Sequence, residues 1–114
     1  MSERDVTNKI KKWIESKHGV CHKVHGGPMS SGFPDLIACI NGRAWIIEVK
    51  VPCAKPRVPK PVREGYCPVM RAWMERGATV LQAQTLYRWQ TAGAVAALAT
   101  GIEDMERIYR EVMQ

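Results

Sequence analysis

Apolar residues near the start of the chain recur at intervals of three or four, the spacing of a helix: Val6, Ile10, Trp13 and Ile14. This pattern predicts a helix over about residues 3–18. Ser2 with Asp5 three residues later resembles a capping box, and Gly19 is a suitable stop. Glu3 lies at the edge of the apolar stripe, because residues 3, 10 and 14 are separated by nearly whole turns.

Two apolar runs, 35–40 and 43–50, are joined by Asn41-Gly42. Asn-Gly between two such runs is a strong hairpin signal and favours a type I′ turn. A two-residue loop also fixes the register, so we expect Ile40 to pair with Arg43 and each earlier residue with the next later one. On the far face of the second strand, Trp45, Ile47 and Val49 are predicted to enter the core.

The same register predicts that Asp35 lies opposite Glu48, with Lys50 on the same face two residues later. Two facing carboxylates repel each other unless a cation joins them, and oxygen donors of this kind suit Mg²⁺ or Mn²⁺. Such an ion can polarise a phosphodiester and activate water, and Lys50 would add a fixed positive charge. The alternative is that Asp35 only begins a strand and that Glu48 and Lys50 are charged surface residues. The placement of all three residues together favours the metal site.

The remaining elements follow from shorter patterns. A short strand is predicted over 20–25. A helix is predicted over about 64–76, and because Pro68 fits best in a first turn, this helix could begin as late as Cys67. A strand is expected over 78–83, a helix over 85–99 and a last helix over about 102–113. The predicted order is α-β-β-β-α-β-α-α, one α/β domain over residues 1–114. In the last helix, some apolar residues could face a second copy or simply the core: Ile102, Met105, Ile108, Tyr109 and Val112.

Charge adds a candidate partner. Seventeen Lys and Arg against eleven Asp and Glu give a net charge of +6. Residues 1–63 hold twelve basic and five acidic side chains, whereas residues 64–114 hold five basic and six acidic ones. This asymmetry points to a polyanion, nucleic acid first, although a solvated basic surface is an equal alternative on charge alone. The polar N-terminus and the lack of a long apolar run lead us to expect an intracellular protein.

Gly32-Phe33-Pro34-Asp35 followed by Glu48-Val49-Lys50 resembles the G-x-PD…EVK pattern of the PD-(D/E)XK nucleases. The match is to the VRR-NUC (virus-type replication-repair nuclease) branch and extends over about residues 3–83. This resemblance implies a restriction-endonuclease-like αβββαβ core, here followed by C-terminal helices.

The resemblance also implies roles. Asp35, Glu48 and the backbone carbonyl of Val49 would bind Mg²⁺ or Mn²⁺, and Lys50 would be catalytic. The family has a Glu early in its first helix, which matches Glu3 here and would be a further metal ligand. Glu15 is the alternative ligand. An interaction of Glu3 with the helix dipole is an equally open interpretation of that residue. The family often has a Gln early in the helix after EVK. Here Tyr66 stands at about that position, a departure from the pattern.

Basic residues beside this pattern are candidates for binding DNA. One group directly follows the candidate active-site strand and a second lies on the first helix: Lys55, Arg57, Lys60 and Arg63, and Lys9, Lys11 and Lys12. They would neutralise phosphates, so recognition of the DNA backbone and shape is expected, not base readout.

Stand-alone members of this branch, mainly phage-encoded, are similar to Holliday-junction resolvases that act as homodimers. The resemblance therefore implies a metal-dependent structure-specific endonuclease acting on branched DNA in the cytoplasm of an infected bacterial host. A flap or nicking nuclease, and a non-catalytic DNA-binding module on a nuclease fold, are the alternatives.

Overall fold

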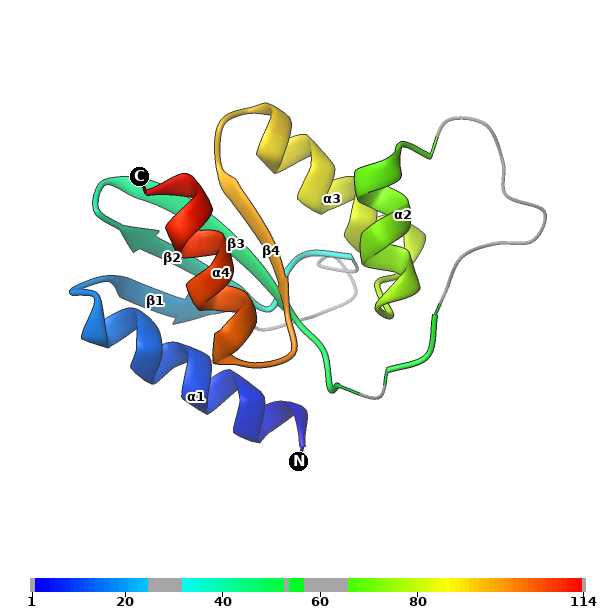
Figure 1. Cartoon of the computed structure of the whole chain (residues 1–114). Helices are drawn as coiled ribbons and strands as arrows, with labels where there is room; N and C mark the ends of the chain where they lie inside the picture. The colour runs from blue at the N-terminus through cyan, green and yellow to red at the C-terminus, as the bar shows by residue number, and fades with distance from the viewer. Residues whose placement is uncertain (1, 25–31, 53, 57–65, 114) are drawn as a thin grey trace.

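The computed structural model describes residues 2–24, 32–52, 54–56 and 66–113. Its elements in chain order are α1 (Glu3–Ser16), β1 (Val20–Lys23), β2 (Leu36–Ile40), β3 (Arg43–Val49), α2 (Pro68–Glu75), α3 (Val80–Thr91), β4 (Val95–Ala99) and α4 (Ile102–Val112). Figure 1 shows their arrangement. No helix in the described ranges is long and apolar enough to cross a membrane.

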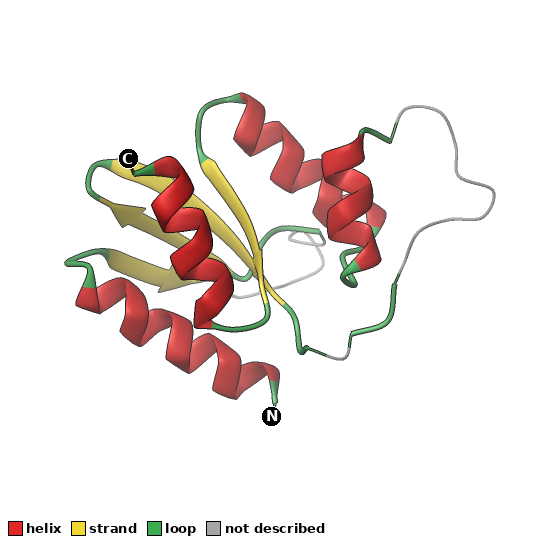
Figure 2. Ribbon diagram, viewed as in Figure 1, coloured by secondary structure: helices red, strands yellow, loops and turns green. Residues whose placement is uncertain are grey.

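One mixed sheet organises these elements in the order β1-β2-β3-β4 (Figure 2). The first three strands are antiparallel, and β4 runs parallel to β3. One apolar cluster joins α1 and α4 to one face of the sheet, and a second joins α2 and α3 to the other. The central strand β3 is therefore covered on both faces, and Trp45 through Val49 are all buried.

The first helix and the hairpin confirm their sequence predictions. Ser2 and Asp5 form the reciprocal capping box at the start of α1. The β2–β3 register runs from Ile40 opposite Arg43 to Leu36 opposite Ile47, as the two-residue loop dictates. Asn41 and Gly42 have φ values of 51° and 79°, the left-handed pair that a type I′ turn requires.

Residues 78–99 contradict the prediction. The expected strand over 78–83 is the start of α3, and the expected helix over 85–99 contains the end of α3 and the whole of β4. Thr79 and Gln82 form a capping box that starts α3, and the small apolar residues of β4 are drawn into the sheet by β3. The order is therefore α-β-β-β-α-α-β-α, and the αβββαβ core closes with β4.

The other two helices agree with the sequence. Pro68 occupies the first turn of α2, with Cys67 as its N-cap. In α4, Met105 is buried, and Ile108, Tyr109 and Val112 pack against the cluster formed by α1 and the sheet. Core packing, one of the two alternatives for this apolar stripe, therefore accounts for these residues.

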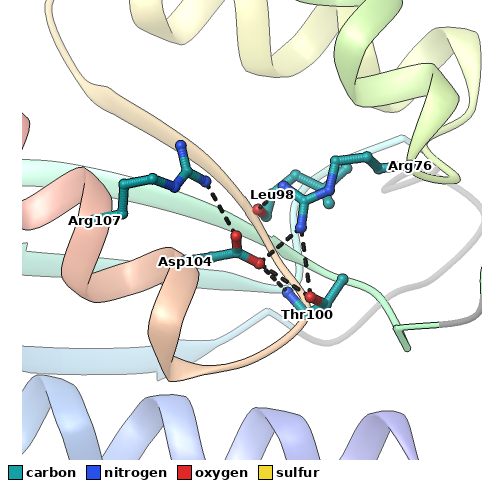
Figure 3. Close-up of polar contacts among 5 residues, drawn as sticks. All are labelled: Arg76, Leu98, Thr100, Asp104 and Arg107. Atoms are coloured by element: carbon teal, nitrogen blue, oxygen red, sulfur yellow. Dashed lines mark hydrogen bonds and ion pairs between the residues drawn. The ribbon is translucent and has the colours of Figure 1, made fainter.

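A polar cluster joins α2 to α4 at the β4 side of the sheet (Figure 3). Arg76, the C-cap of α2, donates to Asp104 Oδ2 at 2.7 Å and to the carbonyl of Leu98 at 3.3 Å. Asp104 also accepts from the Thr100 backbone N–H at 2.9 Å and from Arg107 at 3.1 Å. Burial alone would raise the pKa of the Asp104 carboxyl, but these donors outweigh it and hold the pKa below its usual value.

We predict that Asp104→Asn destabilises the protein by about 1–2 kcal/mol at neutral pH, because two arginines and a backbone N–H lose their charged acceptor. A pKa that is lower in the folded protein than in the unfolded chain stabilises the fold at pH values above the unfolded pKa. This stabilisation is lost as the pH falls through the folded pKa. The difference in the free energy of unfolding between the unaltered protein and Asp104→Asn should therefore become smaller at acidic pH. Urea unfolding at neutral and acidic pH measures it, with Glu106→Gln on the exposed side of α4 as the control. Equal stability at neutral pH would contradict the assigned role.

Candidate functional site

The β2–β3 hairpin brings Asp35 and the end of β3 together. Asp35 immediately precedes β2, one residue beyond the last pair of the ladder. Its Oδ2 accepts a hydrogen bond from the backbone N–H of Val49 at 2.8 Å. This bond fixes the Asp35 carboxylate beside Glu48, which is consistent with the predicted pairing of the two acidic residues across the hairpin.

Glu48 is a buried carboxyl group on the central strand, with 2% of its surface exposed. Parallel pairing places it beside Leu98 of β4, and α2 and α3 cover its face of the sheet. Its Oε1 accepts from Gln82 Nε2 at 2.8 Å and lies 3.6 Å from the Lys50 ammonium. Its Oε2 is buried and has no hydrogen-bond partner among the described residues. One oxygen of a buried carboxylate is therefore left unsatisfied.

These surroundings raise the pKa of Glu48 to about 8. Burial is the largest cause, and the neighbouring charge of Asp35 is the next. The Lys50 ammonium opposes both, while the close approach of the Asp35 carboxyl and the charge of Glu3 add to the rise. At neutral pH the pair therefore holds a proton that a cation bound to both carboxylates would displace.

Lys50 lies where β3 ends, and its side chain is 16% exposed. Its backbone N–H donates to the carbonyl of Ala99 at 3.0 Å, which extends the contact between β3 and β4. Gly77 passes close to this segment: an added Cβ would approach the Ala54 Cβ to 2.8 Å, and its φ of 109° favours glycine. The same added Cβ would lie 3.7 Å from the Lys50 Cδ, so the aliphatic part of this side chain passes beside the turn between α2 and α3.

Gln82 is a site residue that the sequence analysis missed. It is the third residue of α3, and its amide serves two groups: Oε1 accepts from the Thr79 N–H at 2.8 Å, while Nε2 donates to Glu48. The Thr-x-x-Gln pattern is a capping-box signal, but the apolar residues of 78–83 favour a strand, which hides it. Tyr66, which stands where the family pattern led us to expect a Gln, instead packs against the cluster under α2 and α3.

The predicted further ligands lie farther out. Glu3 is exposed in the first turn of α1, and its charge reaches Glu48. Glu15 is exposed near the other end of α1, where its charge acts on Cys21. Within the described ranges, no three His, Cys, Asp or Glu side chains gather closely enough to hold a metal ion. The structure thus brings together Asp35, Glu48 and Lys50, with no third carboxylate of the described residues in direct contact.

The candidate DNA-binding residues are distributed over two regions. Lys9 and Lys12 are exposed on α1, and Lys55 is exposed in the segment after β3. Arg57, Lys60 and Arg63 lie outside the described residues.

The donor set fits a divalent cation. Two carboxylates face each other, the unsatisfied Oε2 of Glu48 offers a lone pair, and Val49 is held beside them by its bond to Asp35. Mg²⁺ commonly takes one or two protein carboxylates and keeps several waters, so it does not require a third acidic ligand. The residues present can therefore hold such an ion and, with Lys50, surround an anionic substrate with positive charge.

Comparison with known proteins identifies the fold. No family model matches the sequence, and no curated protein matches it. Among solved structures, a VRR_NUC domain matches with a TM-score of 0.62 and 20% sequence identity, over 96% of this chain and 96% of that one. The fold expected from the G-x-PD…EVK resemblance is thus confirmed, and the match extends past residue 83 to include β4 and α4. The chain has the fold of a VRR_NUC domain.

Proposed function

We propose that this protein is a metal-dependent nuclease that hydrolyses phosphodiester bonds in DNA, with Mg²⁺ or Mn²⁺ as the cofactor. The observation that supports this most strongly is the buried Glu48, which has an unsatisfied oxygen, faces Asp35 and lies 3.6 Å from Lys50. A structural role alone would favour an apolar residue at this position, because burial of a carboxyl group with one oxygen that lacks a partner among the described residues is costly. The likeness to a VRR_NUC domain supports the same function.

Each residue of the site has a distinct part in the proposed reaction. The bound ion would supply a polarised phosphate and an activated water. Asp35 and Glu48 would bind it, while the Val49 N–H orients Asp35 and Gln82 orients Glu48. Lys50 would stabilise the negative charge that develops on the phosphate.

We further propose that the preferred substrate is a four-way DNA junction, cut by a homodimer. One site of this size cuts one strand, and resolution of a junction requires two symmetric cuts, which a twofold dimer supplies. The α4 stripe packs on the chain's own core, so the interface would use another surface.

A cleavage assay tests this function. Labelled four-way, flap, single-stranded and linear duplex DNA are incubated with Mg²⁺, Mn²⁺ or EDTA. We expect metal-dependent paired nicks on the junction, and a loss of at least about a hundredfold in rate for Glu48→Ala or Lys50→Ala, because each removes charge stabilisation from the transition state. Glu106→Gln, remote from the site, should cut as the unaltered protein does.

The other outcomes separate the alternatives. Cutting of flaps alone would select a flap nuclease, and binding to junctions without cutting under any metal would select a DNA-binding module. Cutting that persists in EDTA or in Glu48→Ala would contradict the metal mechanism.

The raised pKa of Glu48 gives a second prediction. Between 4.5 and about 8 the folded protein holds a proton that the unfolded chain has released. In EDTA, stability should therefore fall as pH rises through this window, and Glu48→Gln should be the more stable protein at its upper end. Mg²⁺ should raise the melting temperature of the unaltered protein and leave that of Glu48→Gln unchanged.

Thermal unfolding followed by circular dichroism at several pH values, with and without Mg²⁺, makes this measurement. The same pH dependence of stability in both proteins would show that Glu48 does not hold the proton. An equal rise in melting temperature with Mg²⁺ would show that Glu48 does not bind the ion.

A further inference from the structure

The segment of chain that leads into β2 lies against α3. Gly32 has a φ of 85°, and a Cβ at this position would come within 2.7 Å of the Leu81 Cβ. The next residue, Phe33, meets Trp89 edge to face, with ring centroids 6.0 Å apart and an angle of 89° between the ring planes. In Figure 1 this cyan segment runs from the side of α3 to the start of β2. The segment therefore contacts α3 both near the start of the helix and two turns farther along it.

The connection from this contact to Asp35 is stiff. Pro34 is buried between them, and its ring fixes its own φ at about −65°. A residue that precedes proline is confined to extended conformations, so the backbone of Phe33 is restricted as well. A displacement of the Phe33 ring is therefore passed on to Asp35, because the intervening backbone has little freedom to absorb it.

The same helix also contacts the second carboxylate of the site. Gln82 donates to Glu48 Oε1 at 2.8 Å. Gln82 and Trp89 are seven residues apart, nearly two whole turns, and so lie along one stripe of α3. One stripe of a single helix thus contacts Glu48 directly and, through the segment that leads into β2, Asp35.

We propose that Trp89 is a positioning residue of the metal site, which acts through Phe33 on Asp35. Through this contact α3 sets the separation between the two carboxylates. The proposal rests on the metal-dependent function and adds a residue that acts on the ion without touching it. An ion bound by two carboxylates requires their oxygens at a defined separation, and loss of a contact that supports a ligand commonly weakens metal binding by roughly ten- to a hundredfold.

The aromatic contact can be altered without a large change in the core. Phe33 and Trp89 are each half-buried, and both border an open cleft of about 460 Å³. Neither is among the fully buried side chains that fill the two apolar clusters. Variants at these two positions should therefore fold.

Binding of Mn²⁺ provides the test, because it requires neither DNA nor cleavage. Electron paramagnetic resonance measures the free ion during a titration. Trp89→Ala should bind Mn²⁺ about tenfold more weakly, whereas Trp89→Phe, which keeps an aromatic ring, should stay within about twofold of the unaltered protein. Tyr87→Ala is the matched control: it removes an aromatic side chain that is 40% exposed on the same helix, and it should leave the affinity unchanged.

A double-mutant cycle tests the route through Phe33. Phe33→Leu should weaken Mn²⁺ binding as much as Trp89→Ala does. The double variant should bind no more weakly than either single variant, because both substitutions remove the same contact. Losses that add in the double variant would overturn the proposed route. Phe33→Leu, compared with Trp89→Phe, decides the proposal even where Trp89→Ala does not fold.

A purely structural contact would give a different result. It would lower the free energy of unfolding in urea and leave the Mn²⁺ affinity of the folded variants unchanged, and this outcome would overturn the proposal. In a cleavage assay, the Mn²⁺ concentration that gives half the maximal rate should rise about tenfold in Trp89→Ala. The rate at saturating Mn²⁺ should return to within about threefold of the unaltered protein, because a positioning residue acts on ion binding and not on the chemical step.

Failure here is distinguishable from failure of the proposed function. A protein that cuts DNA in a Glu48-dependent manner, but in which folded Trp89→Ala binds Mn²⁺ normally, is a nuclease without this positioning residue. A protein whose Mn²⁺ affinity depends on Glu48 and Trp89, but which cuts no DNA, has the supported metal site without the nuclease activity. An unaltered protein that binds no Mn²⁺ would contradict both proposals.

Discussion

The parallel pairing of β4 with β3 is the contact on which the rest of the site depends. It makes β3 an interior strand, so that helices can cover both of its faces and Glu48 loses contact with water. Burial is also the main reason that the pKa of Glu48 rises to about 8. The same pairing continues through the Lys50 N–H to Ala99, which places the ammonium near the carboxylate. On an exposed edge strand the same carboxyl group would stay in contact with water and keep an ordinary pKa.

The site also depends on which polar groups surround the buried carboxyl group of Glu48. One carboxylate oxygen of Glu48 has a donor from Gln82, whereas the other has none among the described residues. Asp35, for its part, is tied to the backbone of Val49. This asymmetry leaves one side of the acidic pair rigid and satisfied and the other open to a cation. The proposed metal binding is therefore favoured both by the donors that orient the two carboxyl groups and by the lack of a donor, among the described residues, at one oxygen of Glu48.

Local sequence rules predicted the hairpin but not the closing strand. Asn41-Gly42 determines its own turn and, through the two-residue loop, the pairing of every residue back to Leu36. By contrast, residues 95–99 are mostly alanine, which favours a helix in isolation, and they form β4 because β3 offers an open edge. Gln82 was missed for the same reason. Its contact with Glu48 spans 34 residues and exists only once α3 has packed on the sheet. Asp35 and Glu48 could be paired from sequence, but the burial of Glu48 could not.

The central claim is that Asp35 and Glu48 form a divalent metal site. Anomalous diffraction from crystals soaked in Mn²⁺ tests it most directly, because it locates the ion without reference to activity. The account predicts a peak about 2 Å from an oxygen of each carboxylate, which is lost in Glu48→Gln. A well-occupied Mn²⁺ peak elsewhere on the protein, with none between Asp35 and Glu48, would contradict it.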